Sequence, residues 1–590
     1  MKKGVLGIIG LLFFISSVNL KAQDLTTYYE KSDFKETASY DEVVSYCKKL
    51  SKASPSVQFS YFGNSPQGRG LPLLIIKKTN DKTEKPYVLI QACIHAGEPD
   101  GKDAGLMLIR DIAVNKKLQS LIDKVNILFI PILNVDGHER FGPYNRINQN
   151  GPIEAGWRTT AQNYNLNRDF MKADAPEMQS WLKMFNTYKP CMVIDCHVTD
   201  GADYQYTLTY GIENQGNIPA PVTDWMNKTY LPLLEKNMNQ LALPIIPYIS
   251  FREWHDPRSG LESWVSPPML CNGYVALHNR PCLLIETHML KDYKSRVNAT
   301  YQMLNQSLLI INANIKALKA AIASSDSIVM SSAFRKTKYP VSYIPGKDSV
   351  MIDFLGFEYE SKQSDLSGGL WFTYSNKPTT FKIPYFNQQL ADECVSLPEA
   401  YIIPPEWIEV INKVKLHGIQ THTLTKEVKI KVKMSLLKEI KWAKSPYEGR
   451  ERINSFKYDN SEAVHSFPAG SVVVSMNQPA ALVAAHILEP DAPDSYLKWG
   501  FFNTIFQQKE YAESYVMEKL AREMLQQNPA LKVEFENKKQ SDTTFSKNPE
   551  EILNWFYARS LWWDEKLNIY PVAKIFDAKE AEKLSNPGNY

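Results

Sequence analysis

The chain is long, ordinary in composition and almost neutral. It has 590 residues, of which 44% are hydrophobic and 22% charged, and its formal net charge at pH 7 is +3. Because one hydrophobic core rarely serves more than about 250–300 residues, this length predicts two or three domains. The small net charge provides no strong field of one sign for nucleic acid, so we expect no nucleic-acid partner.

The first 22 residues have the pattern of a secretory signal peptide. Lys2 and Lys3 form a basic start, residues 5–18 are apolar, and a cleavage point follows Ala22. The apolar stretch is shorter than the ~20 residues of a membrane-spanning helix, and no later segment has the pattern of one. We therefore expect an exported protein, periplasmic or extracellular, without a stable membrane anchor. Its seven cysteines are an odd number in a large chain and several lie in apolar runs, so we expect them to be unpaired.

Residues 40–326 alternate between helix and strand patterns. A helix is predicted over 40–53, and two strands are predicted over 57–63 and 71–78. Four short apolar runs are typical of strands buried on both faces: 87–94, 125–133, 191–196 and 281–286. Further helical patterns occur at about 102–115, 176–188, 221–241 and 292–324. This order predicts an α/β domain over residues 23–326, with a mainly parallel or mixed sheet covered by helices.

The sequence changes character after a serine-rich stretch at 324–338. Segments between 348 and 386 are β-like, and aromatic-rich helices are predicted from about Asp494 to Asn528. We expect a C-terminal accessory region over residues 339–590, β-rich to about 445 and mixed α/β after that. Lysines alternate with apolar residues over 428–434. An anionic partner would suit them, but a solvated strand face or a lysine-protected edge strand is the simpler explanation.

Polar residues that follow buried strands are candidates for chemistry, because ligands bind at the carboxyl ends of strands in open α/β sheets. His95 and Glu98 follow the run 87–94, and His197 follows the run 191–196. Two imidazole nitrogens and a carboxylate suit a catalytic zinc ion, which needs three protein ligands and one open position. Taken alone, Glu98 could equally cap the next helix and His197 could bond in a loop. Together the three predict a zinc site.

A carboxylate also ends the fourth apolar run. Glu286 would be costly to bury there unless it is paired or used. Beside a zinc-activated water it would serve as a general base, which returns the proton to the leaving nitrogen. His288, two residues later, could be an extra ligand, but we interpret it as structural.

The segment 156–170 supplies Arg158, Asn167 and Arg168 within a dozen residues. The planar guanidinium of arginine pairs with a carboxylate through two hydrogen bonds and can stabilise a developing oxyanion. The segment therefore predicts a substrate with a free carboxylate beside the bond to be broken.

These motifs follow one another as HAGE, NVDG, WR, NLNRD, DCH and LLIETH. In this order the chain resembles the zinc carboxypeptidase, or metallocarboxypeptidase, family from about Tyr28 to Asp326. The region after about residue 330 looks like the C-terminal extension of large secreted bacterial members. The resemblance implies an α/β/α sandwich around a mixed, eight-stranded sheet. It also implies one Zn²⁺ per chain, bound by His95, Glu98 and His197, with Glu286 as general base and acid.

The resemblance implies roles for the polar loop residues as well. Arg158 would polarise the scissile carbonyl and hold the oxyanion, while Asn167 and Arg168 would grip the terminal carboxylate of the substrate. The family usually has an aspartate two residues before the Asn-Arg pair, where this chain has Asn165, so the charge behind a zinc histidine is missing. For the family's substrate-contacting tyrosine, Tyr274 is the nearest candidate, although a buried core tyrosine explains it equally well.

Three functions follow from the sequence. The first is a secreted zinc carboxypeptidase that hydrolyses the C-terminal bonds of peptides or proteins. The second is a zinc-dependent peptidase or amidase that acts on bacterial cell-wall peptides, which also carry carboxylates. The third, less favoured because Glu286 and all three ligands are present, is a non-catalytic peptide-binding protein on the same scaffold. Metal content and turnover would discriminate between them. The sequence does not indicate the oligomeric state or the preferred C-terminal side chain.

Overall fold

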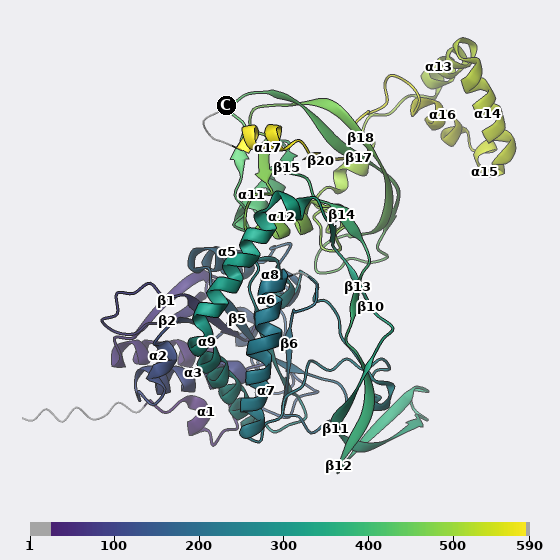
Figure 1. Cartoon of the computed structure of the whole chain (residues 1–590). Coiled ribbons are helices and arrows are strands. Elements are labelled where there is room, and N and C mark those ends of the chain that lie inside the picture. The colour runs from purple at the N-terminus through teal and green to yellow at the C-terminus, as the bar shows by residue number, and fades with distance from the viewer. Residues whose placement is uncertain (1–24, 217, 586–590) are drawn as a thin grey trace, which may run out of the picture.

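The structure, a computed structural model, describes residues 25–216 and 218–585. The expected signal peptide over residues 1–22 lies outside the described residues. Figure 1 shows an α/β region built from the first half of the chain, a β-rich region that packs on it, and a separate group of helices joined to the β-rich region.

A mixed sheet forms the centre of the α/β region. Its strand order is β1-β2-β4-β3-β5-β8-β6. Strands β4, β3, β5 and β8 are parallel neighbours, and antiparallel strands continue the sheet on both sides. The strands are β1 (Val57–Asn64), β2 (Gly70–Ile76), β3 (Tyr87–Ala92), β4 (Asn126–Ile130), β5 (Met192–Thr199), β6 (Leu208–Ile212) and β8 (Cys282–His288). The six strands predicted from the sequence are confirmed, and β6 is an additional one.

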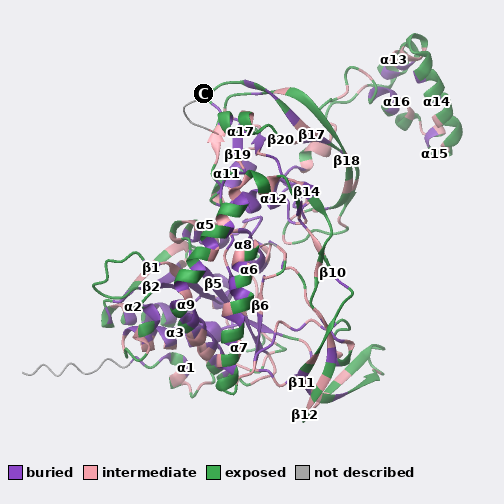
Figure 2. Cartoon of the chain, in the orientation of Figure 1, coloured by how far each residue is buried: buried purple, intermediate pink, exposed green. Residues whose placement is uncertain are grey.

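Helices cover both faces of this sheet, which makes it the middle layer of an α/β/α sandwich. Val88 and Ile90 of β3 pack into one hydrophobic core, and Leu89 between them packs into the other. The first core includes α2 (Tyr40–Ala53), α3 (Asp100–Ala113), α6 (Ala220–Trp225), α7 (Leu231–Gln240) and α9 (Tyr293–Met330). The second includes α5 (Pro176–Tyr188) and α8 (Cys271–Leu277). The expected layering is thus confirmed, and Figure 2 shows the central strands as buried.

The sheet has seven strands among the described residues rather than the expected eight. The segment beside β6 takes the place of a further strand. Tyr210 N donates to Ile246 O (3.0 Å) and Tyr248 N donates to Tyr210 O (2.7 Å). Pro247 lies between these two contacts. The pairing is limited to this one isolated parallel bridge.

Glycines at the start of α3 let this helix lie very close to the sheet. A Cβ atom at Gly101 would lie 2.2 Å from the Cβ of Cys196, and one at Gly105 would lie 2.3 Å from the Phe129 ring. Real side chains do not approach so closely, so both positions require glycine. This packing brings the residues just before α3 against the end of β5.

Helix α9 connects the α/β region to the rest of the chain. It continues past the expected boundary at Asp326 to Met330, through the serine-rich stretch. By length and composition alone α9 could cross a membrane, which we did not expect from the sequence, and 44% of its most apolar window is buried within the protein. Its buried residues Val297, Leu304 and Leu308 pack in the core beneath α3 and α7.

The C-terminal half contains a second, six-stranded sheet with the order β16-β19-β15-β20-β17-β18. Its strands are β15 (Ala400–Ile403), β16 (His422–Thr423), β17 (Val428–Trp442), β18 (Ile453–Phe467), β19 (Val472–Ser475) and β20 (Ile569–Ile575). Helices α11 (Ile408–Leu416), α12 (Ala481–Leu488) and α17 (Ala578–Ser585) accompany it. Residues of β15, α11 and α12 share a hydrophobic core with α5 and α8, so this region packs directly on the α/β sandwich.

A long hairpin and short strand pairs precede this sheet. The hairpin strands β11 (Val350–Gln363) and β12 (Leu370–Phe386) are antiparallel, and β12 also pairs with β7 (Leu261–Glu262) of the α/β region. The shorter elements are α10 (Ser332–Arg335), β9 (Lys338–Pro340), β10 (Tyr343–Pro345), β13 (Gln389–Ala391) and β14 (Cys394–Ser396).

The lysine alternation lies on β17. Val428, Ile430 and Val432 are buried, and Lys429 and Lys431 are exposed. The lysines therefore form a solvated face, while the edge of the sheet is β18 because β17 lies between β18 and β20.

Four helices that precede β20 form a group with its own small core. They are α13 (Ser514–Gln527), α14 (Pro529–Ser541), α15 (Thr543–Ser546) and α16 (Pro549–Tyr557). Regular helix begins only at Ser514, later than the expected Asp494. The residues between form turns and one short 3₁₀ helix.

Candidate active site

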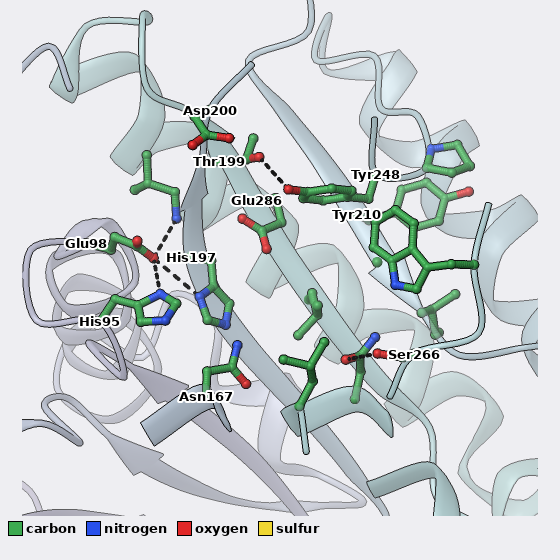
Figure 3. Close-up of a pocket in the computed structure, with 18 of the residues that line it drawn as sticks. His95, Glu98, Asn167, His197, Thr199, Asp200, Tyr210, Tyr248, Ser266 and Glu286 are labelled. Carbon is green, nitrogen blue, oxygen red and sulfur yellow. Dashed lines mark hydrogen bonds and ion pairs between the residues drawn. The ribbon is translucent and has the colours of Figure 1, made fainter. Parts of the chain in front are cut away.

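His95, Glu98 and His197 converge at the carboxyl ends of β3 and β5. The Nδ1 atoms of His95 and His197 lie 3.1 and 3.3 Å from the same carboxylate oxygen, Glu98 Oε2. All three side chains are buried, and their candidate ligand atoms lie within 4.8 Å of one another. Figure 3 shows the three side chains pointing toward one another.

The outward nitrogen of each histidine has its own neighbour. His95 Nε2 lies 3.1 Å from Asn165 Oδ1. His197 Nε2 lies 2.9 Å from Asp195 Oδ2, near enough for an ion pair but without hydrogen-bond alignment. These contacts hold the rings so that both Nδ1 atoms face Glu98, which is the arrangement that zinc ligands need.

The chemistry of these donors fits a zinc ion. Burial lowers the pKa of His95 to about 4, so this ring is neutral at pH 7, as a ligand must be. Burial by itself would raise the pKa of Glu98, but His95, Arg146 and His197 hold it well below the usual range, so Glu98 is ionised. Two nitrogens and one carboxylate oxygen around a point beside a cavity leave a fourth position open.

Glu98 does not cap helix α3. The N-cap of α3 is Pro99, and no side chain makes a capping bond there. Instead, Glu98 Oε2 accepts a hydrogen bond from Val198 N (3.1 Å), and Oε1 accepts from Arg146 Nη2 (3.0 Å) and Arg158 Nη1 (3.3 Å). The capping alternative for Glu98 is therefore wrong.

Glu286 lies on β8 directly beside His197. The two residues are register partners in the parallel ladder of β5 and β8. Burial raises the pKa of the Glu286 carboxyl to about 8, and the carboxylates of Glu98 and Asp195 add to this effect. The side chain faces the cavity (Figure 3). Its raised proton affinity is the property that a group exchanging protons near neutral pH needs.

Asn167 and Arg168 come from the short 3₁₀ helix Leu166–Arg168. Asn167 Oδ1 accepts a hydrogen bond from Cys271 N (3.0 Å), which leaves its amide nitrogen for the cavity. Arg168 Nη1 donates to Asn167 O (2.7 Å). This bond bends the guanidinium back beside its neighbour, so the two side chains present N–H donors together.

One cavity of about 670 Å³ is lined by all seven residues selected from the sequence. Its other lining residues include Tyr210, Tyr248 and Trp264. Tyr248 and Tyr210 lie across the cavity from His95 and Glu98 (Figure 3), and the Thr199 hydroxyl lies 3.1 Å from the Tyr248 hydroxyl. No local pattern distinguished these aromatic residues, because they come from an irregular segment and from the strand that the sequence analysis missed.

Two other side chains are structural. Tyr274 is fully buried in the second core, and its hydroxyl lies 2.8 Å from His417 Nδ1. It does not line the cavity, so Tyr274 is wrong as the substrate-contacting tyrosine. His288 is buried at the end of β8, with Nε2 2.8 Å from Ala202 O, as its structural interpretation predicted.

The segment that carries this site matches a known protein family. The zinc carboxypeptidase family (Peptidase_M14) matches residues 43–210. The chain carries a zinc carboxypeptidase domain. The match includes His95, Glu98 and His197, and the family indicates a zinc-dependent hydrolase, a metallocarboxypeptidase.

Similar proteins include carboxypeptidase 2 of Trichophyton rubrum, which is 22% identical over 473 residues, 77% of this chain and 82% of that protein. Carboxypeptidase Z of Gallus gallus is 32% identical over 144 residues, 22% of this chain and 21% of that protein. A solved metallo-carboxypeptidase from Burkholderia cenocepacia aligns over 47% of this chain and 70% of its own, with 16% identity and a TM-score of 0.36.

Proposed function

We propose that this protein removes residues one at a time from the C-termini of peptides. The observation that supports the proposal best is the shared cavity, which places a His-Glu-His cluster, a buried carboxyl and an Asn-Arg pair around one space. The cluster would hold zinc, and the Asn-Arg pair would hold the free carboxylate of the last residue. A peptide end bound in this way has its last amide bond beside the cluster.

The proposed ligands are His95, Glu98 and His197. Zinc, when bound there, acts as a Lewis acid and lowers the pKa of water. Asn165 and Asp195 keep the two imidazoles oriented. Asp195 and Glu286 raise the pKa of His197, against the effect of its burial, and the bound cation has to compete with that proton.

Glu286 is the proposed general base and acid. It takes a proton from the attacking water, and its buried position favours the protonated form until the leaving nitrogen accepts the proton. The side chain of Arg158 is 43% exposed and its guanidinium lies next to Glu98, so it has N–H groups left to donate to the carbonyl oxygen of the substrate. Such donors stabilise the negative charge that develops on this oxygen.

Export is a separate part of the proposal. It is supported by the signal-like pattern of residues 1–22. The mass of the protein secreted by its host tests it, since cleavage after Ala22 leaves a chain that begins at Gln23.

Digestion of a peptide library by the zinc-loaded protein tests the activity. Each peptide is supplied with a free and with an amidated C-terminus, and mass spectrometry follows the products with and without a chelator. We expect stepwise loss of C-terminal residues from the free peptides, and no loss after chelation or in Glu286→Gln. Cleavage of cell-wall peptides alone would contradict this proposal in favour of the second candidate function.

A further inference from the structure

The accessory region reaches the loop that carries Asn167 and Arg168. The contact is made by the tight turn Tyr447–Arg450, which joins β17 to β18. Tyr447 N donates to Arg450 O (3.0 Å), and Arg450 N donates to Tyr447 O (3.1 Å). The two central residues, Glu448 and Gly449, have φ values of +48° and +80°.

This conformation makes glutamate an unfavourable residue for the turn itself. Two-residue turns with positive φ at both central positions favour Asn-Gly or Asp-Gly, because asparagine and aspartate tolerate the left-handed region better. A backbone conformation that disfavours its own residue suggests that the side chain has a use elsewhere.

The contact made by Glu448 identifies that use. Glu448 Oε2 accepts a hydrogen bond of 3.0 Å from the backbone N of Asn165, 283 residues away in the sequence. Asn165 Oδ1 accepts in turn from Asn167 N (3.0 Å) and lies 3.1 Å from His95 Nε2. A carboxylate of the accessory region therefore fixes Asn165. This residue contacts the proposed zinc ligand His95 on one side and the proposed substrate-binding residue Asn167 on the other.

The other end of the same loop is also fixed from the accessory region. Arg450 donates to both carboxylate oxygens of Asp174, from Nε to Oδ2 (2.7 Å) and from Nη2 to Oδ1 (2.8 Å). The guanidinium lies 3.6 Å from the centre of the Phe501 ring, and Lys413 Nζ is 3.3 Å from Asp174 Oδ1. The turn thus contacts both ends of the loop 165–174.

We propose that the turn Tyr447–Arg450 holds the loop 165–174 in the geometry that grips the substrate carboxylate, with Glu448 as the positioning residue. This inference rests on the proposed roles of Asn167 and Arg168. Glu448 acts through Asn165 on their position. The accessory region then contributes a positioning residue to the active site.

The decisive variant is Glu448→Asn, because asparagine suits the turn better but is one methylene too short to keep the bond. We expect KM for peptides with a free C-terminus to rise about tenfold, the lower range for a hydrogen bond to a charged group. At saturating zinc, kcat, metal content and Tm should stay at or above the wild-type values. Glu448→Gln keeps the length and an acceptor oxygen, so it should restore KM to within about threefold of wild type.

Glu439→Asn is the matched control. Glu439 lies in β17 and, like Glu448, is a glutamate with positive φ (+50°), but its carboxylate pairs with Lys457 on the exposed surface. The same substitution there should leave KM unchanged. A rise of KM in Glu439→Asn as large as that in Glu448→Asn would show a general effect of hairpin substitution and would overturn the proposal.

Hydrogen exchange provides a readout that does not depend on catalysis. Peptides covering residues 163–175 should exchange faster in Glu448→Asn than in wild type, and at the wild-type rate in Glu439→Asn. If the wild-type protein cleaves no peptide, the proposed function fails, whereas this exchange result still decides whether Glu448 fixes the loop. The proposal would be overturned if both KM and the exchange rate were unchanged in Glu448→Asn. It would also be overturned if a lower Tm or a lower zinc content accounted for the higher KM.

Discussion

The Oδ1 atom of Asn165 lies 3.1 Å from the Nε2 atom of His95. An amide at this place orients the imidazole without adding charge behind it. The sequence indicated this departure from the family, and the structure shows that the orienting contact is nevertheless made. Orientation and charge can therefore be separated experimentally in this protein.

Replacing Asn165 should change zinc affinity. In Asn165→Ala, His95 loses its orienting partner, and we expect zinc affinity to fall about tenfold or more. In Asn165→Asp, the contact and a charge are both present, so zinc should bind at least as tightly as in wild type. Competition titration with a chelator measures both. Gln162→Ala, at an exposed site shortly before Asn165, is the control. An unchanged zinc affinity in Asn165→Ala would contradict the orienting role.

Glu286→Gln should separate proton transfer from metal binding. Glutamine has the size of glutamate but cannot accept the proton, so we expect kcat/KM to fall by about 10²–10⁴-fold or more. Zinc content should not change, because Glu286 is not among the proposed ligands. Peptide hydrolysis and metal analysis of the same preparation measure both quantities. Near-normal turnover in this variant would refute Glu286 as the base.

Arg168→Ala should affect substrates according to their C-terminus. The guanidinium is proposed to bind the terminal carboxylate, so kcat/KM for free peptides should fall about 10–100-fold, the range for a hydrogen bond to a charged group. The slow hydrolysis of matched amidated peptides, where it is measurable, should change little. An equal loss on both kinds of peptide would show that Arg168 does not recognise the carboxylate.

Glu177 should make stability depend on pH. It is fully buried at the start of α5, and neither carboxylate oxygen has a hydrogen-bond partner among the described residues. Burial raises its pKa from 4.5 to about 7. A carboxyl that binds its proton more tightly in the folded state contributes stability fully below the unfolded pKa, and this contribution is lost as the pH rises through about 7.

Glu177→Gln tests this dependence. Glutamine stays neutral, so at pH 8 the variant should be more stable than wild type by on the order of 2 kcal/mol. Near pH 4 the two proteins should have nearly the same stability, because the glutamate is then mostly neutral in both states. Denaturant unfolding at the two pH values measures the difference. If Glu177→Gln raised the free energy of unfolding by the same amount at both pH values, the cause would be packing and not the ionisation of Glu177.

The sequence by itself determined the order of most strands and helices that carry the site and seven of the residues that line the cavity. Each depends on a local signal. Residues 87–94 are apolar long enough to be buried on both faces of a sheet, so the polar residues that follow, His95 and Glu98, emerge at its carboxyl edge. The same reasoning applies to His197 and Glu286.

Only the tertiary structure decided which distant residues complete the site. Tyr274 and Tyr248 are both tyrosines near apolar residues, and only packing places the first in the core and the second in the cavity. Glu448 reaches Asn165 because the accessory region packs on helices of the α/β sandwich and brings a turn against a loop 283 residues away. Local periodicity reports which face of an element is buried, but it contains no information about the partner that buries it.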